Sequence, residues 1–340
     1  MNRITHLGID IGGAHLKVIG VNKSNKVVFV DYNYCKIWEG IEKLQAKFKN
    51  INKIINNNSV KCGITMSGEM CDNFKNRLQG AKTLIKECNK LEFNNFFYVS
   101  SKKIFTKKPN IEKLISLNWH SIGKFLENKI ESCIAIDFGS TTTDFICIKN
   151  NKMVNKFTDD YSRINNSELL YTGFTRTPIF GVVHQIDYNK KKLNIIPEFF
   201  SNTSDIYRVL GKLDKEIDLE ETADNSRKDL QRSLIRLSRS FGFDYKSKNL
   251  KKIKVISQKI STIQLNQISK IILQLQKKFL LKDEPVVISG IGQDVVYNFL
   301  KKKKFKTIYF KEFLNKSRLN KEASFHAPAV SIALLLQSLK

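Results

Sequence analysis

The sequence predicts an α/β protein built from two related halves around a central cleft. Helices and strands alternate along most of the chain, and the order of elements restarts after about residue 130. Each half opens with three strands joined by tight turns, and the first turn carries Asp-x-Gly in both "GIDIGGAHLKV" (8–18) and "AIDFGSTTTDF" (135–145). Repetition of one supersecondary unit indicates two halves of the same kind.

The first half reads as a meander followed by alternating helices and strands. Apolar runs at 3–11, 14–22 and 25–32 are separated by Gly-Gly and by a polar Asn-Lys-Ser-Asn turn, which is typical of hairpins. The expected elements that follow are a helix at 37–55, a strand at 60–65, a helix at 72–89, a strand at 96–100 and a helix at 111–130.

The second half repeats the meander and then becomes less regular. Strands are expected at 132–138, 142–149 and 152–158, before an irregular stretch at 160–205. Apolar periodicity predicts a charged helix at 225–241, a long amphipathic segment at 256–281 and an apolar helix at 326–339. Between the last two, a Gly-x-Gly turn joins an expected strand at 285–289 to a helix after it.

A chain of 340 residues usually needs more than one core, so we expect two domains. The first spans 1–130 and the second 131–340, with an inserted substrate segment at about 160–255. The formal charge of +26 is, on its own, typical of a protein with an anionic partner such as nucleic acid or phosphate. The basic residues are spread along the whole chain, however, so we expect no nucleic acid.

No apolar run approaches the roughly 20 residues of a membrane span, and Asp10 interrupts the short N-terminal apolar stretch. We therefore expect a cytoplasmic protein that needs no membrane. The six cysteines form no CxxC pair, which argues against a zinc site and a disulfide framework.

The two Asp-x-Gly turns combine residue types that suit a metal-bound phosphate. Glycine lets the backbone approach a ligand closely, so Gly12, Gly13 and Gly139 are candidates for presenting amides to phosphate. Hydroxyl donors follow the second turn at Ser140, Thr141 and Thr142. Asp10 and Asp137 would hold Mg²⁺, which prefers oxygen ligands. Alternatively, each turn is an ordinary hairpin in which the aspartate bonds its own turn; the paired occurrence favours phosphate binding.

These turns resemble those of the actin, Hsp70 and sugar-kinase superfamily, in which two ribonuclease-H-like domains clasp a phosphate chain. The third element of that superfamily is a strand, a glycine turn and a helix, and "PVVISGIGQDVVYNFL" (285–300) has this form. The resemblance implies a nucleotide-type site at Gly290 and Gly292, with ATP as a possible cofactor beside Mg²⁺.

The chain more closely resembles the hydantoinase A/oxoprolinase-like branch, in its subgroup linked to tetrahydromethanopterin one-carbon metabolism and methanofuran biosynthesis. The stretches that carry this resemblance are "GIDIGGAHLKV" (8–18), "TMSGEMCDNFKNRLQG" (65–80), "NW" (118–119), "AIDFGSTTTDF" (135–145), "YTGFTRTPI" (171–179), "ETADNSRKDLQRSLIRLSRSFGFD" (221–244) and "SGIGQ" (289–293). His15 stands where asparagine is expected, and Ser67 where threonine is expected. His15 and Lys17 lie in the first of these motifs and join the predicted cofactor-binding set.

The resemblance implies a transferase that condenses an aminomethylfuran-methyl diphosphate with a γ-glutamyltyramine-type phenol and releases pyrophosphate. Its partners would then be a small diphosphate and a phenolic amine. Asp144 and Glu69 are candidate general bases because they lie in motif turns. Arg176, in the loop "GFTRTP" (173–178), suits planar binding of phosphate or carboxylate, or else is a solvated surface arginine.

Two other functions stay open from the sequence. One is ATP-dependent chemistry, either a small-molecule kinase or a hydrolase of the hydantoinase/oxoprolinase type. The other is a non-catalytic nucleotide-binding protein of the actin or Hsp70 kind.

Overall fold

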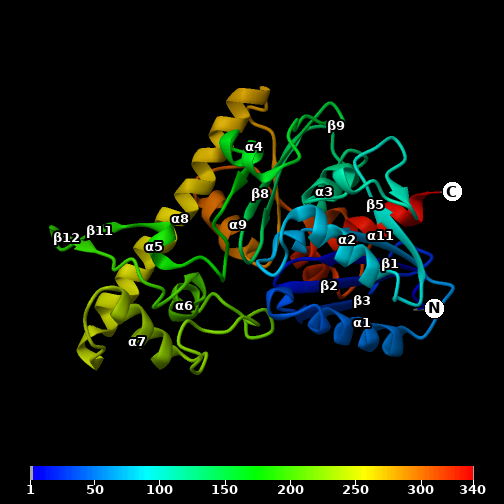
Figure 1. Ribbon diagram of the computed structural model, residues 1–340. Helices are drawn as coiled ribbons and strands as arrows, with labels where there is room; N and C mark the ends of the chain where they lie inside the picture. The colour runs from blue at the N-terminus through cyan, green and yellow to red at the C-terminus, as the bar shows by residue number, and fades with distance from the viewer. Residues whose placement is uncertain (1–2, 340) are drawn as a thin grey trace.

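The computed structural model describes residues 3–339 and contains two similar mixed sheets (Figure 1). The first sheet has the strand order β3-β2-β1-β4-β5-β6, and the second has β10-β8-β7-β13-β14 with β9 on β8. In both sheets the first hairpin is antiparallel and the next two strands run parallel to its first strand. This shared order confirms the predicted repeat.

The first half agrees with the expected order of elements. Its strands are β1 (His6–Ile11), β2 (His15–Val21), β3 (Val27–Tyr34), β4 (Lys61–Met66), β5 (Asn94–Tyr98) and β6 (Phe105–Thr106). Its helices and 3₁₀ turns are η1 (Ile37–Glu39), α1 (Glu42–Ile55), η2 (Gly68–Met70), α2 (Arg77–Cys88), η3 (Ile111–Lys113) and α3 (Asn118–Leu126).

The three predicted helices of this half are shorter than expected. The 37–55 helix is divided into η1 and α1 at Gly40, which has a φ of +149°. The 72–89 helix begins only at Arg77, where the Asn76 side chain caps it by accepting from the Gln79 amide. The 111–130 helix is broken into η3 and α3, because Ser116 adopts a positive φ of 50° between them.

The second half contains β7 (Cys133–Phe138), β8 (Thr143–Lys149), β9 (Lys152–Met153), β10 (Leu169–Leu170), β13 (Val286–Ser289) and β14 (Thr307–Tyr309). The stretch expected to be irregular holds α4 (Asp160–Asn165), α5 (Ile179–Val182), the hairpin of β11 (Gln185–Tyr188) and β12 (Lys191–Asn194), and α6 (Thr203–Val209). The remaining elements are α7 (Leu230–Ser240), η4 (Ser247–Asn249), α8 (Leu250–Phe279), α9 (Gln293–Lys302), η5 (Phe310–Phe313), α10 (Asn320–Phe325) and α11 (Ala327–Ser338).

The inserted segment has a hydrophobic core of its own, built from α5, α6, α7 and the start of α8. Helix α8 is continuous across the expected insert boundary at 255 (Figure 1). Ile253, Ile256 and Ile260 of α8 belong to the insert core, whereas Leu265 and Ile268 belong to the core of the second sheet. This one helix therefore fixes the insert to the second half.

Two helices cross the division expected at residue 130. Helix α3 packs on β7 and β8 of the second sheet, and α11, the last helix, packs on β1, β2 and β4 of the first (Figure 1). The two helices also contact each other, and their apolar residues join one buried cluster with both sheets. A domain boundary at residue 130 thus separates the two sheets, but α3 and α11 each pack on the sheet of the other half. Within residues 3–339, none of the helices combines the length and the apolar character of a membrane span.

Gly8→Ala should destabilise the fold through the contact between β1 and α11. An added Cβ at Gly8 would lie 1.9 Å from the Ala329 carbonyl oxygen and 2.7 Å from the Ala333 amide nitrogen. The helix would have to move off the sheet, which we expect to cost about 1–3 kcal/mol of unfolding free energy. Urea unfolding measures this, with Gly181→Ala as the control because its added Cβ meets only Thr177 Cγ2 at 3.5 Å. Equal stabilities of the two variants would contradict the packing described.

His120 should make the fold less stable in mild acid. Burial, with Lys124 and Arg163 nearby, lowers the pKa of His120 to about 4, and its Nδ1 lies 2.7 Å from the Tyr98 hydroxyl. The unfolded histidine takes up a proton near its ordinary value of about 6.5, but the folded one does not. Stability is therefore lost as pH falls from about 6.5 towards 4.

Between pH 7 and pH 5, the unaltered chain should lose about 2 kcal/mol more unfolding free energy than His120→Gln does. Urea unfolding at the two pH values tests this. His184→Gln, at an exposed position, should keep the loss of the unaltered chain. A His120→Gln variant with the same pH dependence as the unaltered chain would show that His120 is protonated in the fold.

Candidate functional site

The two Asp-x-Gly turns are closed in the same way. The Gly12 amide donates to the His15 carbonyl oxygen (2.9 Å), and the Gly139 amide donates to the Thr142 carbonyl oxygen (3.0 Å). These two amides are therefore used inside their turns, so the expectation that they face a phosphate is wrong for Gly12 and Gly139. Both turns follow strands whose parallel neighbours end at the same edge: Asp10 pairs with Thr65, and Asp137 pairs with Ser289.

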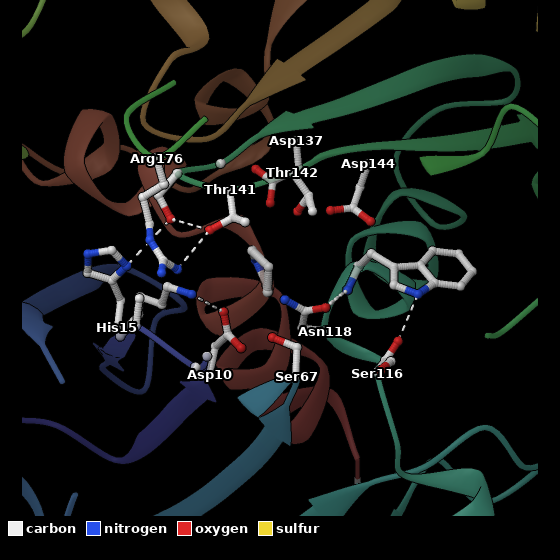
Figure 2. A pocket seen from close by; sticks show the side chains of 18 of the residues that line it. Asp10, His15, Ser67, Ser116, Asn118, Asp137, Thr141, Thr142, Asp144 and Arg176 are labelled. Atoms are coloured by element: carbon white, nitrogen blue, oxygen red, sulfur yellow. Dashed lines mark hydrogen bonds and ion pairs between the residues drawn. The ribbon is translucent and has the colours of Figure 1, made fainter. Parts of the chain in front are cut away.

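One cavity of about 540 Å³ lies between the turns and is lined by both. Figure 2 shows Asp10 and Ser67 on one side of it and Asp137, Thr142 and Asp144 on the other. From the first turn the predicted residues at its wall are Asp10, Gly12, Gly13, His15 and Lys17. From the second half they are Asp137, Gly139, Ser140, Thr141, Thr142, Asp144 and Arg176. The structure thus brings together twelve of the predicted residues from distant parts of the chain.

The carboxylates of Asp10 and Asp137 are suited to bind a cation. Asp10 is 1% exposed; its Oδ2 accepts from Lys17 Nζ at 2.9 Å, and its Oδ1 has no hydrogen-bond partner among the described residues. Burial and the nearby charge of Asp144 raise the pKa of Asp137 to about 7, although Ser289 Oγ donates to its Oδ1 at 2.9 Å. Bound positive charge would stabilise both ionised groups.

Mg²⁺ fits these two acids as a cation that shares its coordination with other oxygen ligands. In the part of the chain that the structure describes, no group of three or more His, Cys, Asp or Glu side chains could hold a metal ion by itself. Mg²⁺ commonly binds one or two carboxylates and takes its other ligands from water and substrate phosphates. A site at the predicted pair Asp10 and Asp137 would be of this partial kind.

Asp144 lies beside Asp137 on β8 and is held from behind by an arginine. Arg163 of α4 is 1% exposed; its NH1 donates to Asp144 Oδ1 at 2.8 Å and its NH2 to the Glu168 carbonyl oxygen at 2.9 Å. Burial raises the pKa of Asp144, and Arg163 opposes that shift. The Arg163 guanidinium also stacks on Trp119, 3.8 Å from the ring centroid. Asp144 is therefore a fixed carboxylate at the cavity wall.

Arg176 reaches the cavity on a loop that packs tightly on the second turn. A Cβ at Gly173 would lie 2.3 Å from the Ser140 carbonyl oxygen, so this close approach requires glycine. Arg176 NH1 donates to Thr141 Oγ1 (3.1 Å), and the guanidinium lies 5.1 Å from the ring centroid of Trp38. Among residues 3–339 no carboxylate forms an ion pair with Arg176. Its positive charge remains available to a ligand.

His15 closes the same end of the cavity as a neutral imidazole (Figure 2). It is 2% exposed, stacks on Tyr32 with ring centroids 4.8 Å apart, and places Nε2 3.2 Å from Glu220 Oε1. Burial, reinforced by Lys17 and Arg176, lowers the pKa of His15 well below its ordinary value. Burial also raises the pKa of Glu220, whose Oε1 accepts from Thr175 Oγ1 at 2.8 Å. Contact between His15 and Glu220 joins the first half to the insert.

Three predicted site residues do not reach the cavity wall. Glu69 is fully buried behind it and accepts a hydrogen bond from Ser116 Oγ (2.7 Å), so the structure does not support it as a base that contacts substrate. Gly290 has a φ of +91°, and a Cβ there would lie 2.4 Å from the Phe138 carbonyl oxygen. A Cβ at Gly292 would lie 2.3 Å from Phe138 Cδ1. Both glycines therefore let the β13 to α9 turn pack against β7.

Sequence reasoning missed four residues of this site: Trp38, Trp119, Arg163 and Glu220. Both tryptophans of the chain line the cavity, and their rarity was a signal in the sequence. Arg163 lies in the stretch expected to be irregular, and Glu220 directly precedes the "ETADN" motif. Neither carries a local pattern that distinguishes it from a surface charge.

Comparison with solved structures gives the fold. The chain is similar to the ethanolamine utilization protein EutJ from Carboxydothermus hydrogenoformans, with a TM-score of 0.50, 10% identity, and coverage of 96% of this chain and 88% of that one. The predicted class, two domains of the actin, Hsp70 and sugar-kinase type around a cleft, is confirmed.

Two archaeal proteins are similar in sequence, and both are named (4-{4-[2-(γ-L-glutamylamino)ethyl]phenoxymethyl}furan-2-yl)methanamine synthase. The protein of Methanocaldococcus jannaschii is 29% identical over 344 residues, covering 98% of each chain. That of Methanococcus vannielii is 32% identical over 217 residues, which are 62% of this chain and 94% of the relative. The model of the hydantoinase/oxoprolinase family matches residues 118–319, from the start of α3 to the residue before α10. The chain belongs to the hydantoinase/oxoprolinase family.

Proposed function

We propose that this chain is a transferase that forms the aryl ether in the compound after which its archaeal relatives are named. The acceptor is the phenol of γ-glutamyltyramine, and the donor is an aminomethylfuran-methyl diphosphate, with pyrophosphate as the second product. The observation that carries the proposal is the meeting of Asp10, Asp137 and Arg176 at one cavity, where Arg176 has no ion pair with a carboxylate of residues 3–339. This arrangement suits a leaving group with several negative charges.

In the proposed reaction, the bond between the furan methylene carbon and the diphosphate oxygen breaks, and its electron pair leaves with pyrophosphate. The phenol oxygen forms the new bond to that carbon, and the phenol proton passes to the Asp144 carboxylate. Arg176 and Lys17 bind the charge that develops on the leaving oxygens. Asp144 is suited to accept this proton because Arg163 binds only its Oδ1. This contact orients the carboxylate at the cavity wall.

Asp10 and Asp137 would hold Mg²⁺ together with the diphosphate. When bound, the ion would offset the negative charge of the leaving group. Both substrates are small polar molecules, and we place the reaction in the cytoplasm.

The test is to offer the purified protein the furan diphosphate, γ-glutamyltyramine and MgCl₂, and in parallel ATP. We expect the ether product by mass spectrometry, with one pyrophosphate released for each ether formed, and no phosphate from ATP. Hydrolysis of ATP, or transfer of its phosphate to either small molecule, without ether formation would contradict the proposal. That result would favour the kinase or hydrolase alternatives.

A further inference from the structure

The two ends of the cavity differ in chemistry, and each has one tryptophan. Trp38 lies in η1, and this turn is fixed to the first Asp-x-Gly turn by the Ile37 amide, which donates to the Gly13 carbonyl oxygen (3.2 Å). Trp119 lies in α3, and its indole N–H donates to the Ser116 carbonyl oxygen (2.9 Å). Figure 2 shows Arg176 and His15 at one end and Ser116 and Asn118 at the other.

The arginines beside the two tryptophans differ in their available charge. Arg176, next to Trp38, has no carboxylate partner in the described part of the chain. Arg163, next to Trp119, is neutralised by Asp144 at 2.8 Å and uses a second nitrogen on a backbone carbonyl. The first end can therefore attract an anion, whereas the second presents a carboxylate oxygen and, among the described residues that line it, no free positive charge.

We propose that the Trp38 and Arg176 end binds the diphosphate donor and that the Trp119 and Asp144 end binds the phenol acceptor. This assignment rests on the proposed function and adds which substrate occupies which end. A free guanidinium is well suited to bind a diphosphate, and Arg176 supplies one. A phenol carries no charge but must lose a proton, and Asp144 can accept it. Leu169, which pairs with Asp144 in the sheet and lines the cavity, gives the acceptor ring an apolar neighbour.

The two tryptophans act differently in this assignment. Trp38 is partly exposed and borders the cavity, so its ring can contact the furan of the donor. Trp119 is 2% exposed and is one of the residues that line the cavity. It supports Arg163 and, through it, Asp144, and it is a reporter of acceptor binding. Because the chain has only these two tryptophans, replacing either one leaves a single tryptophan, whose fluorescence reports on one end of the cavity.

The test titrates Trp38→Phe and Trp119→Phe separately with the furan diphosphate and with γ-glutamyltyramine. Calorimetry on the unaltered chain first shows that each substrate binds. We expect the acceptor to change the fluorescence of Trp119 in Trp38→Phe, and the donor to change that of Trp38 in Trp119→Phe. The opposite pairing, or no fluorescence change at substrate concentrations that saturate in calorimetry, overturns the assignment and leaves the proposed function intact.

A second variant tests the assignment without fluorescence. Arg176→Gln should weaken donor binding at least about tenfold in calorimetry and leave acceptor binding within about twofold. Equal weakening of both substrates, or weakening of the acceptor alone, overturns the assignment. If neither substrate binds the unaltered chain, the proposed function itself fails and the assignment fails with it.

Discussion

Asp137→Asn should lower kcat for ether formation by roughly 100- to 1000-fold. The substitution keeps the size of the side chain and an oxygen that can accept from Ser289 Oγ. It removes the negative charge that would hold a cation against the leaving diphosphate. The folded structure should persist, because the pKa of Asp137 is already raised by burial and the cavity disfavours its charge.

Steady-state release of pyrophosphate measures the effect, with thermal unfolding as the check on folding. Asp187→Asn is a matched control, because Asp187 is exposed in the β11 to β12 hairpin and away from the cavity lining. It should retain full activity. An Asp137→Asn variant with kcat within about tenfold of the unaltered chain would show that this carboxylate does not act on the leaving group.

Arg236→Met should lower the free energy of unfolding by about 3–5 kcal/mol. Arg236 of α7 is fully buried; its NH2 donates to Asp205 Oδ1 at 2.7 Å and its NH1 to Asp224 Oδ1 at 3.0 Å. Methionine fills a similar volume, but it removes the two hydrogen bonds that Arg236 Nε (3.0 Å) and NH2 (2.7 Å) donate to Oδ1 of the buried Asp205. Asp224 belongs to the loop that carries Glu220 to His15, so the loss also loosens this end of the cavity.

Arg239→Met provides the control on the same helix. Arg239 is 50% exposed and lies 3.6 Å from Asp224, so its loss should cost at most about 1 kcal/mol. Urea unfolding of the two variants separates a buried ion pair from an exposed one. Equal costs would contradict the burial of Arg236 in this network.

The repeat could be predicted from the sequence because it depends on local residue patterns. Alternating apolar runs and Asp-x-Gly turns predicted both hairpins, and the paired motifs predicted that Asp10 and Asp137 share one cavity. The packing of α3 on the second sheet and of α11 on the first could not be predicted, because it depends on contacts between residues about 200 positions apart.

The errors in the predicted site have a physical reason. Asp10 and Asp137 lie near the ends of β1 and β7, and their positions in the two sheets are enough to bring them to the cavity. Glu69 and the glycines at 290 and 292 also lie in motif turns, but a motif does not show which way a turn faces. A buried hydrogen bond to Ser116 and close contact with Phe138 account for these residues.

The most direct test of the shared phosphate site is a crystal structure with pyrophosphate and Mn²⁺ in place of Mg²⁺. We predict an anomalous manganese peak beside the carboxylates of Asp10 and Asp137, with the pyrophosphate between the two Asp-x-Gly turns and within reach of Arg176. Pyrophosphate and manganese bound elsewhere, with this cavity free of both, would contradict the proposed reaction.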